Sequence, residues 1–261
     1  MTFTNTAAIE VSDVSKTYRH QGRKGEMFTA LAAVNLTVQR GEFVSLIGAS
    51  GCGKTTLLRM MSGLIEGDTG YIKVNGQTVN GVPPAIGFVF QEPALLPWRS
   101  VRDNLDFALE HKKLPSADRK AIIEEKLRLT NLLDFADYYP YALSGGMQQR
   151  AGLARALACD PDVLFMDEPL SALDAFTRRR LQQDIAGILG SIGATTVLVT
   201  HDVDEAVFFS DRIIVMGTSP GRVRETVEVP FNKPRTHADL LGNPEVAKIR
   251  DHVLQIVLEL A

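Results

Sequence analysis

The sequence predicts an α/β fold with a mainly parallel sheet, an N-terminal antiparallel β portion and a helical insertion. Continuous apolar runs at 163–166, 195–199 and 213–216 are typical of strands that are buried on both faces of a parallel sheet. A helix is predicted between the first two runs, from an N-cap at Asp174 to about Gly190. This alternation of strand and helix indicates an α/β core.

The N-terminal portion has a different pattern. Short β-rich runs separated by turns occupy residues 8–47, and further short strands are predicted at 70–74 and 86–90. The turn signals Asn75-Gly76 and Pro83-Pro84 lie between these two strands. This part is therefore expected to form the antiparallel portion of the fold.

The middle of the chain, from about 100 to 158, is predicted to be helical. Ser116 is expected to cap a helix that runs toward Leu133, and Ser144 is expected to cap another. A last helix is predicted after Asn243, where a proline follows the cap position. Its apolar face would consist of Val246, Ile249, Val253, Ile256 and Leu260.

Composition excludes several classes of protein. The chain has 261 residues, with 28 basic and 31 acidic side chains, so no broad basic field for nucleic acid is present and no nucleic-acid partner is expected. Cys52 and Cys159 are the only cysteines, which excludes a disulfide scaffold and a cysteine-based metal site. A reducing, cytoplasmic compartment is therefore expected.

The N-terminus has neither a basic segment nor an apolar segment of the kind found in signal peptides, so no signal peptide is expected. No apolar run approaches the roughly 20 residues that a membrane-spanning helix needs. Any role at a membrane would therefore require a partner protein.

The strongest functional signal is the G-x-x-x-x-G-K-T pattern that begins at Gly48, which is a phosphate-binding loop. Its glycines allow successive backbone N–H groups to face an anion, and the following helix adds its positive end. Lys54 is expected to reach the β- and γ-phosphates of a nucleoside triphosphate, and the Thr55 hydroxyl to bind Mg²⁺. The residues predicted to bind nucleotide here are Gly48, Ala49, Ser50, Gly51, Cys52, Gly53, Lys54, Thr55 and Thr56.

Two adjacent carboxylates, Asp167 and Glu168, follow the apolar strand at 163–166. Ligands bind at the carboxyl ends of strands in α/β sheets, which favours a role at the phosphates. Asp167 is expected to hold Mg²⁺, and Glu168 to orient the attacking water. The structural alternative is that both acids cap the turn before Pro169.

The segment from Ser144 is the second unusual motif. Ser144 is followed by Gly145 and Gly146, which cost stability in the first turn of a helix, about 1 kcal/mol each. They are useful where a backbone must approach a ligand closely, and a helix N-terminus is a ready phosphate site. By itself, this Ser-Gly-Gly is equally consistent with an ordinary turn.

Taken together, the motifs resemble those of the ATP-binding subunit of ABC transporters, over essentially residues 8–230. The resemblance rests on their order along the chain. The matching features are Tyr18, residues 48–56, Gln91, residues 143–150, residues 162–168, residues 171–174 and His201. It implies the fold of phosphate-loop nucleoside triphosphatases with the helical insertion of ABC proteins.

The resemblance also implies roles for single residues. Tyr18 would stack on adenine, although a buried strand tyrosine is the alternative. Gln91 would touch Mg²⁺ or water and sense the membrane partner, and His201 would contact the γ-phosphate. Segment 171–174 would contact the opposite subunit, although Asp174 can also cap its helix. The implied catalytic residues are Lys54, Gln91, Glu168 and His201, and the implied metal ligands are Thr55, Gln91 and Asp167.

At the level of the assembly, the resemblance implies a head-to-tail pair of ATPase subunits with ATP and Mg²⁺ as cofactors. One site would combine the phosphate loop of one chain with Ser144, Gly145, Gly146 and Gln148 of the other. A transmembrane permease would hold the pair at the cytoplasmic face of the inner membrane, and a solute-binding protein would act indirectly. The ATP-binding domain is expected over 1–230, with a helical part at about 92–160 and a helical tail at 231–261.

A finer resemblance links residues 91–104 to the ATPases of importers of the nitrate, sulfonate and taurine type. Pro220-Gly-Arg222 and Lys233-Pro-Arg235 indicate the same subfamily, whereas Leu170-Ser-Ala172 departs from the Phe-Gly-Ala that it often carries. Trp98 is expected either on the face that grips a permease or in the core. The alternative function is a soluble ABC ATPase of an assembly system, such as iron–sulfur cluster biogenesis.

Overall fold

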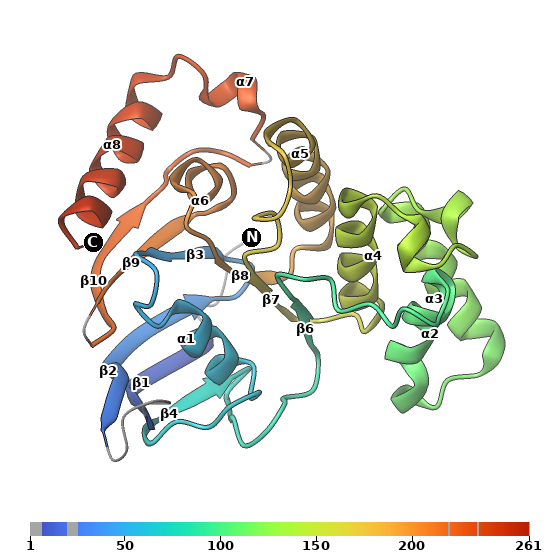
Figure 1. Cartoon of the computed structure of the whole chain (residues 1–261), viewed down its shortest axis with the longest axis horizontal. Helices are drawn as coiled ribbons and strands as arrows, with labels where there is room; N and C mark the ends of the chain where they lie inside the picture. The colour runs from blue at the N-terminus through green and yellow to red at the C-terminus, as the bar shows by residue number, and fades with distance from the viewer. Residues whose placement is uncertain (1–6, 20–25, 219, 234, 261) are drawn as a thin grey trace. The chain divides into compact units, whose positions relative to one another are not determined.

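The computed structural model describes residues 7–19, 26–218, 220–233 and 235–260. The chain consists of two compact units (Figure 1). Unit 1 comprises residues 1–84 and 194–261, and unit 2 comprises residues 85–193. Unit 2 thus contains the segment at about 92–160 that was predicted to be helical, together with flanking strands and one further helix.

The parallel strands of unit 1 have β3 (Phe43–Gly48) at their centre. Parallel neighbours flank it on both sides: β8 (Thr195–Val199) and β9 (Arg212–Gly217). An antiparallel edge strand, β10 (Arg222–Glu228), follows β9. Every residue of β3 and β8 is buried, as expected of strands inside a parallel sheet, and most of these residues are apolar.

A second sheet in unit 1 is antiparallel, with the order β2-β1-β4-β5. Its strands are β1 (Ala7–Arg19), β2 (Met27–Gln39), β4 (Thr69–Val74) and β5 (Gln77–Thr78). The first two have 13 residues each and are much longer than the predicted runs, because their pairing continues through several register shifts. The predicted antiparallel N-terminal portion is confirmed.

The helices of unit 1 are α1 (Lys54–Met61), α6 (Val203–Phe209), α7 (His237–Leu240) and α8 (Pro244–Glu259). Helix α8 has Asn243 as its N-cap, as predicted. Its buried side chains Val246, Val253 and Ile256 pack in one cluster with residues of β3, α6 and β9. The last helix therefore belongs to the hydrophobic core of unit 1.

Unit 2 contains two parallel strands, β6 (Ile86–Val89) and β7 (Val163–Asp167). Its helices are α2 (Val101–Leu109), α3 (Ser116–Leu129), α4 (Gly145–Ala158) and α5 (Ala175–Ile192). Three short 3₁₀ segments, at Glu110–Lys112, Leu133–Phe135 and Pro140–Ala142, connect them. In Figure 1, α4 lies between α5 and the pair α2 and α3, and it packs against all three.

The structure corrects one helix start and adds two strands. Ser116 is the first residue of α3 and Pro115 is its N-cap, so Ser116 does not cap this helix, which ends at Leu129 rather than Leu133. Strand β10 was not predicted, because its exposed positions alternate with half-buried ones and carry charged side chains. The two-residue strand β5 is too short to leave a pattern.

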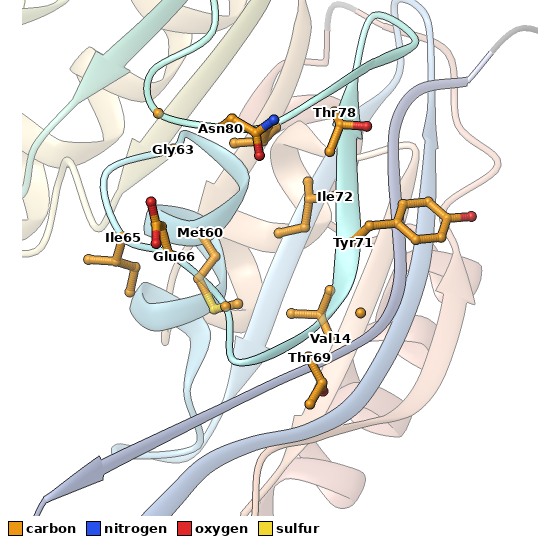
Figure 2. A pocket seen from close by; sticks show the side chains of 14 residues that line it. Val14, Met60, Gly63, Ile65, Glu66, Thr69, Tyr71, Ile72, Thr78 and Asn80 are labelled. Carbon is orange, nitrogen blue, oxygen red and sulfur yellow. The ribbon is translucent and has the colours of Figure 1, made fainter.

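A pocket of about 200 Å³ lies in unit 1 between the end of α1 and β4. Figure 2 shows Met60 on the helix side and Ile72 on the strand side, with Asn80 above them. None of the predicted nucleotide-binding residues is among those that line this pocket. Across the described ranges, no helix is long and apolar enough to cross a membrane.

Candidate functional site

The phosphate loop connects β3 to α1 in unit 1, and its glycines are required by close packing. A Cβ atom on Gly48 would lie 2.4 Å from the Met216 carbonyl oxygen of β9. At Gly53, where φ is +93°, a Cβ atom would lie 2.5 Å from Leu31 Cδ2 of β2. Both positions therefore exclude any larger residue, and neighbouring strands fix the path of the loop.

The crest of the loop is open. Ser50 and Gly51 are exposed, and a Cβ atom on Gly51 would meet nothing within 4 Å. Gly53 is the N-cap of α1 and has no side chain to accept hydrogen bonds from the first N–H groups of the helix. The positive end of α1 therefore faces an open loop, an arrangement that fits an anion such as a phosphate.

Lys54 lies inside the curve of the loop and is only 6 % exposed. Its ammonium Nζ donates to the carbonyl oxygens of Gly48 at 2.8 Å and Ala49 at 3.1 Å, and contacts Cys52 Sγ at 3.7 Å. These acceptors are neutral, so the positive charge is left to attract an anion at the loop. This places the cation at the phosphate loop, while its contact with the β- and γ-phosphates stays a prediction.

Gly221 supports the back of the loop, and the sequence did not reveal this role. A Cβ atom there would lie 2.2 Å from the Cys52 carbonyl oxygen and 2.7 Å from that of Ala30. The Gly221 N–H donates to the Ala30 oxygen at 3.0 Å, and the Ala32 N–H donates to the Gly221 oxygen at 3.0 Å. The Pro-Gly-Arg motif at 220–222 was the available signal, but it indicated only a subfamily.

His201 follows the end of β8, at the same sheet edge from which the phosphate loop starts. The Thr200 N–H donates to the Leu46 carbonyl oxygen of β3 at 3.2 Å. Asp202 caps α6, as predicted, by accepting from the Glu205 N–H at 3.1 Å. The Glu205 carboxylate accepts a hydrogen bond from Thr200, so the turn that carries the exposed His201 is held on both sides.

Tyr18 lies near the end of β1 and is 38 % exposed, which excludes the alternative of a buried strand tyrosine. It pairs with Phe28 of β2, and two residues earlier Lys16 pairs with Leu31. Because Leu31 also contacts the loop at Gly53, this strand pairing places Tyr18 on the side of unit 1 that carries the phosphate loop. Lys16 Nζ lies over the Tyr18 ring, 5.6 Å from its centre, and the stacking of this ring on adenine stays a prediction.

In unit 2, the two carboxylates lie at the end of β7: Asp167 is its last residue and Glu168 follows it. Asp167 is only 4 % exposed, and Glu168 is half-buried. Glu168 has a φ of +43° and precedes Pro169. A left-handed backbone costs a residue with a side chain about 1–2 kcal/mol, and such strain concentrates at functional sites.

Gln91 is connected to Glu168 through Ser171. The Gln91 Nε2 donates to Ser171 Oγ at 3.3 Å, and Ser171 Oγ donates to the Glu168 carbonyl oxygen at 3.0 Å. In the sequence, Ser171 stood out as the first residue of segment 171–174, which was implied to contact an opposite subunit, and as part of a departure from a subfamily pattern. No local pattern could have revealed a bond between residues 80 positions apart.

The N-terminus of α4 is exposed at Ser144 and Gly145. Ser144 is its N-cap, as predicted. The Gln148 amide donates to the carbonyl oxygens of Pro140 at 2.9 Å and Leu143 at 3.3 Å. Gln148 thus holds the loop that leads to this helix end, while its contact with nucleotide stays a prediction.

Asp174 caps α5, as the local alternative predicted. Its carboxylate accepts from the N–H groups of Phe176 at 3.1 Å and Thr177 at 3.0 Å. The bond from the Thr177 N–H is the main cause that lowers the pKa of Asp174. The predicted contact of 171–174 with an opposite subunit stays a prediction.

The predicted residues thus fall into two groups. Tyr18, the phosphate loop and His201 belong to unit 1, whereas Gln91, residues 144–148, Asp167 and Glu168 belong to unit 2. Within the described ranges, no group of three or more His, Cys, Asp and Glu side chains could hold a metal ion. Magnesium in nucleotide sites is bound by one or two protein oxygens together with the phosphates, and the assignment of Thr55, Gln91 and Asp167 as its ligands stays a prediction.

Comparison with known proteins shows the family. The ABC transporter family matches residues 31–171. A taurine import ATP-binding protein of Jannaschia sp. is 41% identical over 239 residues, which cover 90% of this chain and 89% of the relative. A bicarbonate transport ATP-binding protein of Synechocystis sp. is 39% identical over 255 residues, covering 97% and 89%.

Among solved structures, the ATP-binding cassette MJ0796, in a dimeric post-hydrolysis state with ADP and Pi, matches with a TM-score of 0.75. It is 32% identical, and the match covers 86% of this chain and all of that one. ATP and Mg²⁺ are the cofactors of such cassettes. With the phosphate loop, the buried lysine and the paired carboxylates, these matches show that the chain belongs to the ABC transporter family, as an ATP-binding subunit that hydrolyses ATP.

Proposed function

We propose that this chain is the ATPase subunit of an importer for small anions of the nitrate, sulfonate or taurine type. The observation that carries its ATPase role is the open phosphate loop with Lys54 held beneath it. The import role is supported by relatives that are named for taurine import and bicarbonate transport. No feature of the described residues favours the alternative of an assembly scaffold.

In this proposal, each predicted residue has a role in binding or hydrolysing ATP. The phosphate loop and Lys54 bind the β- and γ-phosphates, Tyr18 stacks on adenine, and Thr55, Gln91 and Asp167 hold Mg²⁺. When bound, Mg²⁺ neutralises charge on the phosphate oxygens. Positioning and charge neutralisation then provide most of the rate enhancement, because phosphoryl transfer needs little covalent assistance.

Glu168 orients the attacking water and accepts its proton, and His201 contacts the γ-phosphate. The left-handed backbone of Glu168 supports this role, because a strained conformation is retained where it holds a side chain in a required direction. The bond from Ser171 to the Glu168 carbonyl oxygen stabilises that conformation.

Two copies are proposed to pair head to tail, so that Ser144, Gly145 and Gly146 of one copy complete the nucleotide site of the other. The dimeric state of the similar cassette MJ0796 supports this pairing. The exposed N-terminus of α4 supports it as well, because Ser144 and Gly145 are accessible there and a helix N-terminus favours an anion.

Exposed aromatic side chains of unit 2 are the proposed contact with a membrane permease. Trp98 is 71 % exposed, so the prediction that it lies in the core is wrong. Tyr138 is 48 % exposed, and its main-chain carbonyl oxygen accepts from the N–H of Val101, three residues after Trp98, at 2.9 Å. Tryptophan and tyrosine are enriched among the residues that contribute most to protein interfaces, which supports this proposal.

The location follows from this partner: the chain is proposed to sit at the cytoplasmic face of the membrane, bound through the permease. Purification of the tagged chain from membranes tests the proposal, and a polytopic permease is expected to co-purify. In vesicles that contain the complex, taurine or nitrate presented with the solute-binding protein should increase ATP hydrolysis. Isolation with a soluble scaffold and no permease would contradict an import role.

A further inference from the structure

One face of α4 holds the loop that follows Gln91. Gln149, Gly152 and Arg155 are three residues apart and therefore share a face of this helix. Gln149 Nε2 donates to the Gln91 carbonyl oxygen at 2.8 Å. Arg155 donates to the two carbonyl oxygens beyond it, from Nη2 to Pro93 at 2.9 Å and from Nη1 to Ala94 at 2.6 Å.

The middle of this face is packed against the loop at ordinary van der Waals distance. A Cβ atom on Gly152 would lie 3.5 Å from the Cβ and carbonyl oxygen of Pro93, so the loop lies directly on the helix. Ala94 has a φ of +49°, which is a left-handed conformation that a residue with a side chain rarely adopts. The planar fork of Arg155 therefore fixes two neighbouring carbonyl groups of a strained turn.

These contacts carry a cost in folding free energy that a purely structural role would not require. Gln149 is 4 % exposed, and its buried Oε1 has no hydrogen-bond partner in the described part of the chain. Burial also lowers the pKa of Arg155, because the guanidinium loses its water. An apolar contact of the same size would avoid both costs, which favours a role in placing the loop.

The Gln91 side chain is linked through Ser171 to the backbone of Glu168, the proposed catalytic carboxylate. The Gln91 side chain donates to Ser171 Oγ, which donates to the Glu168 carbonyl oxygen. Gln91 is thus held by its main chain to α4 and by its side chain to the turn after β7. A displacement of α4 would lengthen the bond from Gln91 to Ser171, which is already 3.3 Å.

We propose that Gln149 and Arg155 are positioning residues, which fix the Gln91 loop to α4 and thereby keep the Gln91 side chain against Ser171. This inference rests on the proposed role of Gln91 in ATP hydrolysis. It assigns to α4 a function beyond its exposed N-terminus: the orientation of this helix sets the orientation of Gln91.

A double-mutant cycle tests the proposal in the full-length chain. Arg155→Met and Gln149→Leu are each combined with Gln91→Ala, and kcat and KM for ATP are measured. Arg155→Met should lower kcat by roughly tenfold and change KM by less than about twofold, because the phosphate loop is untouched. In the Gln91→Ala background, neither substitution should lower kcat further. Arg155→Lys, which keeps one donor group, should recover part of the rate.

Lys112→Met is the matched control, since Lys112 Nζ donates to the Cys159 carbonyl oxygen at 2.5 Å beyond the other end of α4 and does not contact the Gln91 loop. It should leave kcat unchanged. If Arg155→Met does not fold, as judged by thermal unfolding, Gln149→Leu carries the cycle, because it removes a single bond with little change in volume.

The outcomes separate the two proposals. Wild-type hydrolysis by Gln91→Ala would overturn the proposed role of Gln91, and the inference about α4 with it. The second possible outcome is that Gln91→Ala hydrolyses ATP slowly, and that Arg155→Met and Gln149→Leu lower its kcat further by the same factor as they lower the wild-type kcat. This outcome would overturn only the positioning role of α4.

Discussion

Gly221 shows how a residue far from the phosphate loop in sequence controls its shape. The Gly221 backbone bonds to β2 on both sides, and its Cα faces the Cys52 carbonyl oxygen so closely that no side chain fits. Lys54 in turn depends on the path of that loop, because it donates to the loop's own carbonyl groups. A substitution at Gly221, outside the phosphate loop, should therefore change the affinity for ATP.

Gly221→Ala should lower ATP affinity, because a Cβ atom 2.2 Å from the Cys52 oxygen forces the loop to shift. Overpacking of this kind costs about 1–3 kcal/mol of folding free energy as well. Gly217→Ala in β9 is the matched control, since its nearest neighbour would lie 3.6 Å away. Titration with a fluorescent ATP analogue measures the difference, and equal affinity of both variants would show that Gly221 does not shape the loop.

Residue identities could be predicted from sequence wherever chemistry is local. The phosphate loop has a fixed spacing, and the acids Asp167 and Glu168 follow an apolar strand directly. The roles of Ser171 and Gly221 could not be predicted, because each depends on a contact with a segment distant in the chain. Such contacts are known only from the distances between residues in the folded chain, and the residue types alone do not indicate them.

At the scale of elements, burial decided which strands could be predicted. Strands β3, β7 and β8 are buried throughout and consist mostly of apolar residues. Strand β10 pairs on one side with β9 and carries charged residues, so it has no such run. Caps were predictable where a carboxylate or hydroxyl precedes a helix, as at Ser144 and Asp174.

The cap of α5 makes stability depend on pH. The pKa of Asp174 is lowered in the folded chain, so its stabilisation is present above the unfolded value of about 3.9 and is lost as the pH falls through the folded value. Asp174→Ala should lower the urea midpoint at neutral pH, and the difference from wild type should shrink in acid. Asp174→Asn keeps a cap acceptor without a titrating group, so its difference from wild type should be small at pH 7. A midpoint of Asp174→Ala equal to that of wild type at pH 7 would contradict this role.

The C-terminal segment is joined to α6 by Arg235, which is 4 % exposed. Nη1 donates to the carbonyl oxygens of Val207 and Ser210, both at 2.7 Å, and Nη2 donates to that of Phe231, also at 2.7 Å. The neighbouring Pro234 of the Lys-Pro-Arg motif lies outside the described residues. The Lys-Pro-Arg motif, which had indicated only a subfamily, thus contains a buried arginine that bonds to α6, the helix that follows His201.

Arg235→Met should destabilise the chain by about 2–4 kcal/mol, because it leaves buried carbonyl groups without donors. Arg235→Lys should lower the free energy of unfolding by less, since an ammonium can still donate to some of these carbonyl oxygens. Urea unfolding measures both variants. Identical midpoints for Arg235→Met and wild type would show that water replaces the guanidinium at no cost.

For the molecule as a whole, the sequence predicted the α/β class, the antiparallel N-terminal portion and the family, and the structure and comparisons confirm all three. The predicted boundaries at 92–160 and 231–261 stay predictions, because compact units are defined by contacts that sequence periodicity does not report.

The central claim is that the phosphate loop holds ATP while Glu168 directs water at the γ-phosphate. The most direct test is the release of inorganic phosphate by Glu168→Gln at saturating Mg–ATP, with ATP binding measured in the same preparation. A general base contributes about 10²–10⁴-fold, so ATP should bind as in wild type while phosphate release falls at least about tenfold. Phosphate release at the wild-type rate would contradict this claim and move the activation of water to another residue.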